Sequence, residues 1–297
     1  MKTVATRFSA LVCLALAFSQ TASAELIYGV ANNGGSSSLL TWDSASPTNV
    51  ISSTFLDFSA NTQDDAIVSI DVRPSTGQLW GLGASGRPYI INPVNGVAND
   101  IVPFAPGLNG LNFGFDFNPV IDRIRATAET NMNRVYNPNT GQTETIGTNL
   151  SYGPADPNFG VDPNVVHSAY SNNFFLATST QLYGIDTGLD ILATQANNAG
   201  TLGTIGPLGV NVGAVGGFDI SGNTGIAYAT LLPANSSVSQ FYTINLLTGA
   251  ATSLGQIDGG VIITAMTVAN PGIPEPSTLA LAGLSMLGCV VARRKAA

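Results

Sequence analysis

The chain has 297 residues, of which only 9% are charged, and its formal net charge is −8. Soluble domains typically contain about 25% charged residues, so solubility here must depend on Ser, Thr, Asn and backbone groups. Between Glu25 and Gly272, five Arg and no Lys stand against 17 Asp or Glu, a net charge of −12. A body this acidic is a poor partner for nucleic acid and for an anionic membrane surface.

The N-terminus has the three parts of an export signal. Lys2 and Arg7 give a positive start, residues 8–18 are mostly apolar, and residues 22–24 form a small-residue cleavage site. We therefore expect residues 1–24 to be a signal peptide that is cut between Ala24 and Glu25. The alternative is a permanent membrane anchor, but the apolar run is too short to span a bilayer.

A unit of four short strands recurs along the rest of the chain. Its clearest copy, residues 217–257, alternates runs of apolar, aromatic and Thr residues with Gly and Asn turns. The first strands of successive units begin near Val68, Phe113, Val165, Gly217 and Ile262, a spacing of 45 to 52 residues. A four-stranded unit with this period predicts the blades of a β-propeller.

The last unit is incomplete, which predicts how the ring closes. Residues 261–268 supply a first strand, and residues 26–31, 39–42 and 50–55 supply the other three. Pairing the two ends gives an all-β, single five-bladed β-propeller over residues 25–270, with no exposed sheet edge. The alternative is two domains joined by the irregular stretch 196–212, but matching units lie on both sides of it.

Strand positions predict a packing role for most aromatic residues. We expect packing between blades for Trp42, Trp80 and five further residues, namely Phe55, Phe115, Phe117, Phe218 and Tyr242. The one histidine, His167, lies in an alternating strand, so a solvent-facing or hydrogen-bonded role is favoured over a catalytic one. A single histidine offers little basis for a Ser-His-Asp catalytic triad and excludes a metal site built from several imidazoles.

Carboxylates offer two low-specificity hypotheses. Asp64 and Asp65 share a loop and are candidate oxygen ligands for Ca²⁺, the one cofactor considered. Asp156 and Asp162 each begin an Asp-Pro-Asn sequence, which is turn chemistry first. A pair of carboxylates about 5 to 10 Å apart can also hydrolyse a glycoside, but the sequence does not give the separation.

The arginines of the body all fall between residues 73 and 134. Arg123 and Arg125 share one face of an alternating strand, and we expect Arg134 near them on the following strand. Together they form a candidate anion site for a carboxylated or sulfated polysaccharide. The alternative is internal pairing with neighbouring carboxylates, namely Asp116, Asp122 and Glu129.

Two runs carry a resemblance to a known family. NFGFDFNPVIDRIR at residues 112–125 and GTLGTIGPLGV at residues 200–210 resemble an uncharacterised bacterial family, domain of unknown function number 4394. The resemblance covers residues 26–268 and implies a shared propeller-like fold, with no activity or catalytic residues to carry over. Family members often have a plain Asp-Pro-x-Thr-Gly turn, whereas the segment around Asp156 and Asp162 is less regular.

The tail, residues 271–297, has three parts. Pro274, Glu275 and Pro276 precede an apolar run at 277–292, and a basic cluster follows that includes Arg293 and Arg294. This layout resembles the PEP-CTERM sorting signal of Gram-negative bacteria. The resemblance implies transient insertion of a short hydrophobic helix in the inner membrane, cleavage by an exosortase near the Pro-Glu-Pro motif, and release to the surface. An ordinary anchor is the alternative, although 16 residues reach only about 24 Å, short of the roughly 30 Å core.

These features predict an exported protein of the cell surface or biofilm matrix. We expect a non-enzymatic binding or structural module associated with exopolysaccharide; the alternative is a propeller-type carbohydrate hydrolase. Two carboxylates facing each other in a central funnel would favour the hydrolase, and a featureless funnel would favour the binding module. Nucleic acid is not expected as a partner.

Overall fold

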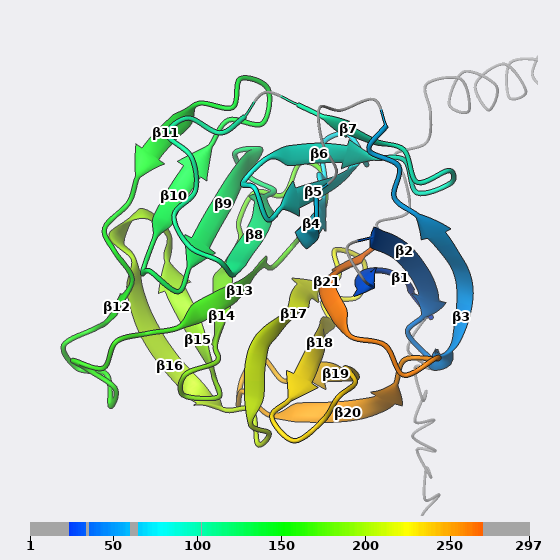
Figure 1. Cartoon of the computed structure of the whole chain (residues 1–297). Helices are drawn as coiled ribbons and strands as arrows, with labels where there is room; N and C mark the ends of the chain where they lie inside the picture. Colours follow the sequence, from blue (N-terminus) through cyan, green and yellow to red (C-terminus); the bar gives the residue numbers. More distant parts are fainter. Residues whose placement is uncertain (1–23, 34–35, 60–64, 102, 270–297) are drawn as a thin grey trace, which may run out of the picture.

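The computed structural model describes residues 24–33, 36–59, 65–101 and 103–269. Five sheets surround a common axis, four with four strands and one with five (Figure 1). The predicted single five-bladed propeller is confirmed. The inner strands, one from each blade, are β4 (Ile67–Val72), β8 (Phe113–Asn118), β13 (Val165–Tyr170), β17 (Val212–Ile220) and β21 (Ile263–Val268).

Outside each inner strand, three strands follow in antiparallel order. The second strands are β5 (Leu79–Gly83), β9 (Arg123–Ala128), β14 (Leu182–Asp186), β18 (Ala227–Pro233) and β1 (Leu26–Asn33). The third are β6 (Pro88–Ile91), β10 (Asn133–Tyr136), β15 (Ile191–Ala196), β19 (Gln240–Ile244) and β2 (Ser36–Asp43). The outer are β7 (Ala98–Asp100), β11 (Thr143–Ile146), β16 (Thr201–Pro207), β20 (Ala251–Gln256) and β3 (Ser46–Phe55), and β12 (Ser151–Tyr152) lies parallel beside β16.

The two ends of the body share one sheet, the closing blade, formed by β21, β1, β2 and β3. β21 pairs antiparallel with β1, from Ile27 opposite Val268 to Ala31 opposite Ile263. The backbone amide of Ala269 extends this ladder by donating to the Leu26 carbonyl at 2.8 Å. The predicted closure by N- and C-terminal strands is therefore confirmed.

The stretch 196–212 is not a linker, contrary to the two-domain alternative. It contains a 3₁₀ turn, η1 (Asn197–Ala199), and β16, the outer strand of the blade whose inner strand is β13. Its glycines serve close approach of neighbouring chain segments, because a Cβ at Gly206 would lie 2.3 Å from the Thr248 carbonyl oxygen. The sequence looks irregular there because glycine replaces the alternating apolar residues that mark the other strands.

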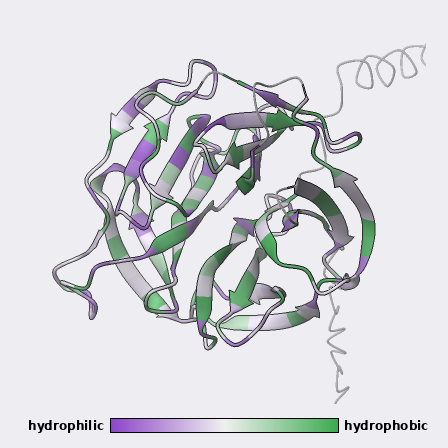
Figure 2. Cartoon of the chain, in the orientation of Figure 1, coloured by the Kyte–Doolittle hydropathy of each residue, from purple (hydrophilic) through white to green (hydrophobic). Residues whose placement is uncertain are grey.

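The core lies between the faces of neighbouring blades, and Figure 2 shows hydrophobic residues spread over the strands of all the sheets. Trp42 packs edge-on against Phe241 with ring centroids 5.6 Å apart, and Trp80 packs in the same way against Phe117 at 5.3 Å. The packing role is confirmed for the predicted aromatic residues with one exception. Phe55 is 75% exposed and ends the outer strand β3, most of whose side chains are exposed or half-buried.

Candidate functional site

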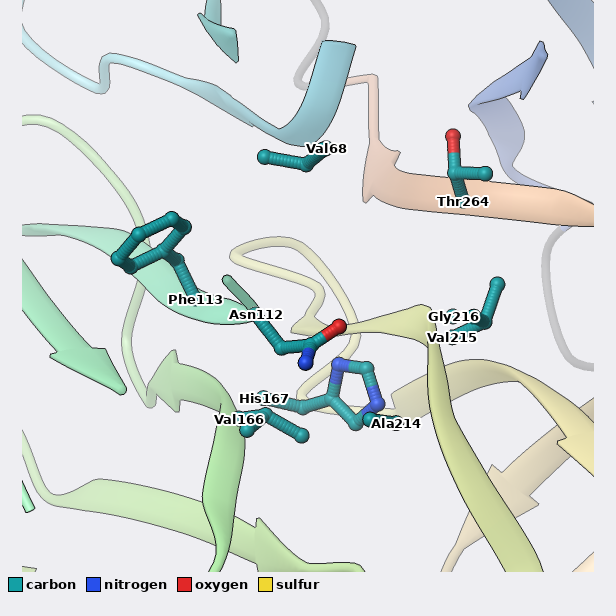
Figure 3. Close-up of a pocket in the computed structure, with 9 residues that line it drawn as sticks. All are labelled: Val68, Asn112, Phe113, Val166, His167, Ala214, Val215, Gly216 and Thr264. Carbon is teal, nitrogen blue, oxygen red and sulfur yellow. The ribbon is translucent and has the colours of Figure 1, made fainter. Parts of the chain in front are cut away.

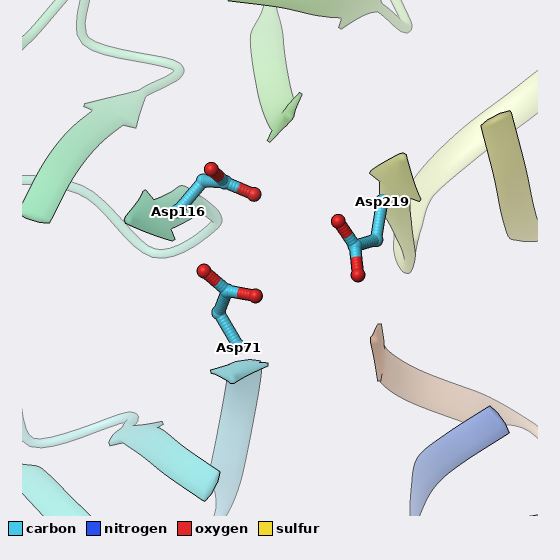
Figure 4. A group of neighbouring side chains, drawn as sticks. All are labelled: Asp71, Asp116 and Asp219. Carbon is cyan, nitrogen blue, oxygen red and sulfur yellow. The ribbon is translucent and has the colours of Figure 1, made fainter. Parts of the chain in front are cut away.

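Three buried aspartates meet on the propeller axis (Figure 4). Asp71 lies on β4, Asp116 on β8 and Asp219 on β17. Each stands between two apolar residues near the C-terminal end of its strand. Their side chains offer oxygen atoms within 4.8 Å of one another, and each residue is at most 2% exposed. We call these residues the axial carboxylates.

Each axial carboxylate accepts backbone amides at the axis. Asp71 accepts from Val72 and Phe117, both at 2.7 Å, and Asp116 accepts from Tyr170 at 3.2 Å. Asp219 completes the set, because it accepts from two further backbone amides, those of Ile220 at 2.6 Å and Val268 at 2.7 Å.

These five amides occupy equivalent positions, one on each inner strand. Three carboxylates therefore satisfy five amides, and three of the bonds join one blade to the next: Asp71 to Phe117, Asp116 to Tyr170, and Asp219 to Val268. Backbone amides buried without an acceptor are costly, so this arrangement stabilises the ring. In the two remaining units the aspartate position holds Ala169 and Thr267. The Thr267 hydroxyl lies 3.2 Å from an Asp71 oxygen and 2.8 Å from an Asp219 oxygen.

Burial governs the protonation of the axial carboxylates. Loss of water raises the pKa of Asp71 well above its usual value, and the nearby Asp219 charge raises it further. Burial followed by the charges of Asp71 and Asp219 raises the pKa of Asp116 well above its usual value, and burial also raises the pKa of Asp219. Three like charges this close cannot all persist without a counter-charge. The cluster therefore suits shared protons, or a hard cation with oxygen ligands.

A small cavity of about 80 Å³ lies at the other end of the inner strands (Figure 3). Residues of all the inner strands or their entering connections line it, including Val68, Asn112, His167, Gly216 and Thr264. The sequence predicts a solvent-facing or hydrogen-bonded side chain for His167. The residue is 5% exposed, so the solvent-facing position is wrong. Its Nε2 atom has no hydrogen-bond partner among the described residues. Burial lowers the pKa of His167 to about 4, which keeps the imidazole neutral at physiological pH.

The structure does not bring the three candidate arginines to one surface. Arg123 forms an ion pair with Glu144, and Arg125 is 2% exposed, donating to Asn133 at 2.7 Å and to Asn198 at 2.8 Å. In the ladder between β9 and β10, Arg125 lies opposite Val135, and Arg134 lies opposite Ala126. Adjacent residues of a strand point to opposite faces, so the side chains of Arg125 and Arg134 lie on opposite faces of the sheet.

The partners of these arginines differ from those expected in the internal-pairing alternative. Asp122 binds Arg73, and Glu129 accepts the backbone amides of Leu111 and Asn112 instead of an arginine. Arg134 donates to the Gly107 carbonyl.

The candidate calcium ligands are only partly described. Asp64 lies outside the described residues, whereas Asp65 is buried and accepts hydrogen bonds from Ser85 and from the Tyr89 hydroxyl at 3.1 Å. Asp156 accepts the Asn158 amide at 2.9 Å and the Thr204 amide at 2.6 Å, and Asp162 accepts from Asn131. The carboxylate that begins each Asp-Pro-Asn sequence is thus used in turn and loop bonds.

The axial carboxylates were missed by reasoning from sequence, although a signal existed. An aspartate between two apolar residues recurs at one position of the first strand in three units, as Ile-Asp-Val, Phe-Asp-Phe and Phe-Asp-Ile. A charged residue repeated within an otherwise apolar strand indicates a shared buried role.

Comparison with known families identifies the body and the tail. The family model of Domain of unknown function (DUF4394) matches residues 38–267. The chain belongs to this family. A second model, the PEP-CTERM protein-sorting motif, matches residues 272–295. No curated protein matches the chain.

Among solved structures, Kuenenia stuttgartiensis hydrazine synthase is similar with 10% identity and a TM-score of 0.39. The likeness covers 70% of this chain and 52% of that one, so the chain spans about half of the structure it matches.

The sorting motif indicates that this DUF4394 protein is exported to a surface or extracellular destination, and it implies processing by an exosortase, a membrane enzyme. Its motif residues, Pro274, Glu275, Pro276, Arg293 and Arg294, lie outside the described residues. At the predicted signal cleavage site, Glu25 is buried, and its carboxylate accepts from Ser221 and from Thr224 at 2.9 Å. Within the described ranges, no helical segment has the length and hydropathy needed to cross a bilayer.

Proposed function

We propose that the exported body is a non-enzymatic module that binds exopolysaccharide in a groove beside Phe55. The groove has a volume of about 570 Å³ and lies between the closing blade and the connections around Ser237 and Ile262. None of the described residues that line it is charged. We call it the Phe55 groove.

The lining of the Phe55 groove suits a neutral sugar chain. Phe55 is largely exposed and presents an aromatic surface for the apolar face of a sugar ring. Ser38, Ser53 and Ser237 add hydroxyl groups that donate and accept hydrogen bonds. A pocket with an apolar wall and a few polar groups is the usual form of a small-ligand site. The exposed aromatic ring in this uncharged groove is the observation that carries the proposal.

Calorimetric titration of the full chain with purified neutral exopolysaccharide fragments tests this function. Phe55→Ala should weaken binding roughly tenfold, since truncating an aromatic residue that anchors a binding site costs more than about 1 kcal/mol and about 1.4 kcal/mol is tenfold. Phe159→Ala is the matched control, because Phe159 is also exposed, at 62%, and does not line the groove. Equal affinities of the two variants would contradict the assignment of the groove.

The axial carboxylates favour a second candidate, a carbohydrate hydrolase. Facing carboxylates are what glycoside hydrolysis requires. Against it, Asp71, Asp116 and Asp219 are almost fully buried and already accept backbone amides, so a substrate would have to displace those bonds. Release of reducing ends from the same polysaccharide by the full chain, abolished in Asp116→Asn, would establish the hydrolase in place of the binding module.

A further inference from the structure

The turn between β13 and β14 contains three consecutive exposed apolar residues. Phe174 is 46% exposed, Phe175 51% and Leu176 74%. Leu176 also has a φ of 66°, a left-handed conformation that is unfavourable for a side chain of this size. Backbone strain of this kind persists where the surrounding structure imposes it and often marks a functional segment.

This turn lies at one defined end of the propeller. The bonds from Phe117, Tyr170 and Val268 to the axial carboxylates show that the inner strands run side by side in the same direction. The turns that follow the inner strands therefore open at one end of the axis. The turn after β8 presents Val120 and Ile121 there, both exposed.

The chain leaves the body at this same end. The Ala269 amide, just after β21, donates to the Leu26 carbonyl, and the neighbouring Glu25 binds the turn at 221–225. In that turn Gly222 packs so closely on the turn between β13 and β14, in the neighbouring blade, that a Cβ would lie 2.1 Å from the Asn173 carbonyl oxygen. Contacts thus link the exit of the chain directly to the segment that bears Phe174.

We call six exposed apolar residues of this end the apolar rim: Leu26, Val120, Ile121, Phe174, Phe175 and Leu176.

The sequence beyond the exit tethers the apolar rim to a membrane during sorting. The PEP-CTERM motif begins at residue 272, and its apolar run starts at Ser277. The chain from Ala269 to Ser277 spans at most about 28 Å even when fully extended. While the apolar run is inserted before cleavage, the rim end is therefore the end held nearest the bilayer.

The distribution of charge is compatible with this orientation. In the turns that carry the rim, Asp122 is neutralised by Arg73, whereas Asp43 lies near the rim and accepts a backbone amide of its own turn. At the opposite end, Glu129 directly follows β9 and Asp162 lies in the connection that enters β13. Part of the negative charge that makes the whole body a poor partner for anionic lipid thus lies away from the rim.

We propose that the apolar rim rests on the lipid bilayer while the tail is inserted, with Phe174, Phe175 and Leu176 among the acyl chains at the interface. Exposed aromatic and leucine side chains favour this position. The contact holds the body in one orientation, with the cleavage motif between the rim and the membrane. It is independent of the saccharide proposal, since the Phe55 groove is formed by other residues.

Fluorescence of variants that each carry one added tryptophan tests the proposal on the full chain. The Phe175→Trp variant is reconstituted through its own tail into vesicles of phosphatidylethanolamine and phosphatidylglycerol, with and without brominated acyl chains. The native Trp42 and Trp80 are buried, so the unsubstituted protein supplies the background. Phe159→Trp is the matched control, because Phe159 is a similarly exposed phenylalanine on the connection that enters β13.

We expect the added emission of the Phe175→Trp variant to shift to the blue and to be largely lost in brominated vesicles. The added emission of the Phe159→Trp variant should be unchanged. A second rim variant, Val120→Trp, should behave like Phe175→Trp, so the test does not depend on one substitution. Equal quenching at positions 175 and 159 would overturn the proposal. So would a blue shift at position 175 without quenching by bromine, which would indicate a protein contact instead of lipid.

Discussion

Asp219 should contribute more to the closure of the ring than its counterpart Asp116. Asp219→Ala removes the acceptor of the Ile220 amide at 2.6 Å and the Val268 amide at 2.7 Å, and Val268 belongs to the strand that joins the two chain ends. Asp116→Ala is the matched control. Asp116 is equally buried, but among the described backbone amides it accepts only that of Tyr170, at 3.2 Å.

The magnitude follows from the donors left without an acceptor. A buried donor without a partner costs about 1 to 3 kcal/mol, so two backbone amides give roughly 2 to 6 kcal/mol. The Asp219→Ala substitution also removes the charge repulsion between Asp219 and Asp71, which offsets part of this loss. We therefore expect a net loss of about 2 to 4 kcal/mol for Asp219→Ala and about 1 kcal/mol or less for Asp116→Ala.

Calorimetry of the two variants measures this difference. At about 2 to 4 °C per kcal/mol for a body of this size, Asp219→Ala should melt roughly 5 to 15 °C below the unsubstituted protein. Asp116→Ala should stay within about 4 °C of it. Equal melting temperatures for the two variants, or an increase for Asp219→Ala, would refute the reasoning, since repulsion among the carboxylates would then outweigh their bonds to the ring.

Three further predictions concern pH and processing. Burial raises the pKa of all three axial carboxylates, so the folded state retains protons that the unfolded state releases. The free energy of unfolding should therefore be greatest below the ordinary aspartate pKa of 3.8 and should fall as the pH rises through the raised pKa values of the folded state. Thermal melts of a variant with Asn at all three positions should lack this fall, and an unchanged pH profile would contradict the shared-proton interpretation. The pKa of His167, lowered to about 4 from 6.5, acts in the opposite direction: folding excludes a proton, so roughly 3 kcal/mol should be lost as pH falls from 6.5 to 4, and His167→Gln should abolish that loss. Mass spectrometry of the mature protein should find a body that ends between residues 272 and 276, whereas a C-terminus intact through Ala297 would contradict exosortase cleavage.

The ring could be predicted from the sequence because its information is local and repeated. Turn residues such as those at 221–225 recur at nearly fixed spacing, and each marks the end of one strand and the start of the next. The closing blade was also predictable, because counting strands leaves one at the C-terminus and three at the N-terminus. Phe55 was misjudged for the opposite reason: strand alternation shows which side chains share a face, but not that most side chains of the outer strand β3 are exposed.

The arginine site shows a second limit of sequence reasoning. Arg123 and Arg125 do alternate on one strand, as predicted, yet Arg123 lies partly exposed beside Glu144 while Arg125 is buried toward Tyr170 and Asn198. The depth of a residue along a strand in a radial sheet depends on the neighbouring blade, which is distant in the chain. Asn198 in particular belongs to the stretch that looked like a linker.

The axial carboxylates show what determines the centre of this fold. Five inner strands bring five equivalent amides to one axis, and the geometry of the ring, not the sequence of any one blade, creates the need for acceptors there. Ala169 occupies the aspartate position of β13, so this strand offers no carboxylate to the Ile220 amide of the following blade. That amide instead donates to Asp219 of its own strand. Where the position holds Thr267, the Val72 amide is accepted by Asp71 of its own strand in the same way. Three carboxylates thus suffice for five blades, and fewer buried charges are needed than a strict repeat would place at the axis. Ala and Thr can therefore occupy two of the five repeat positions without leaving an axial amide unpaired, and the aspartate recurs in only three units.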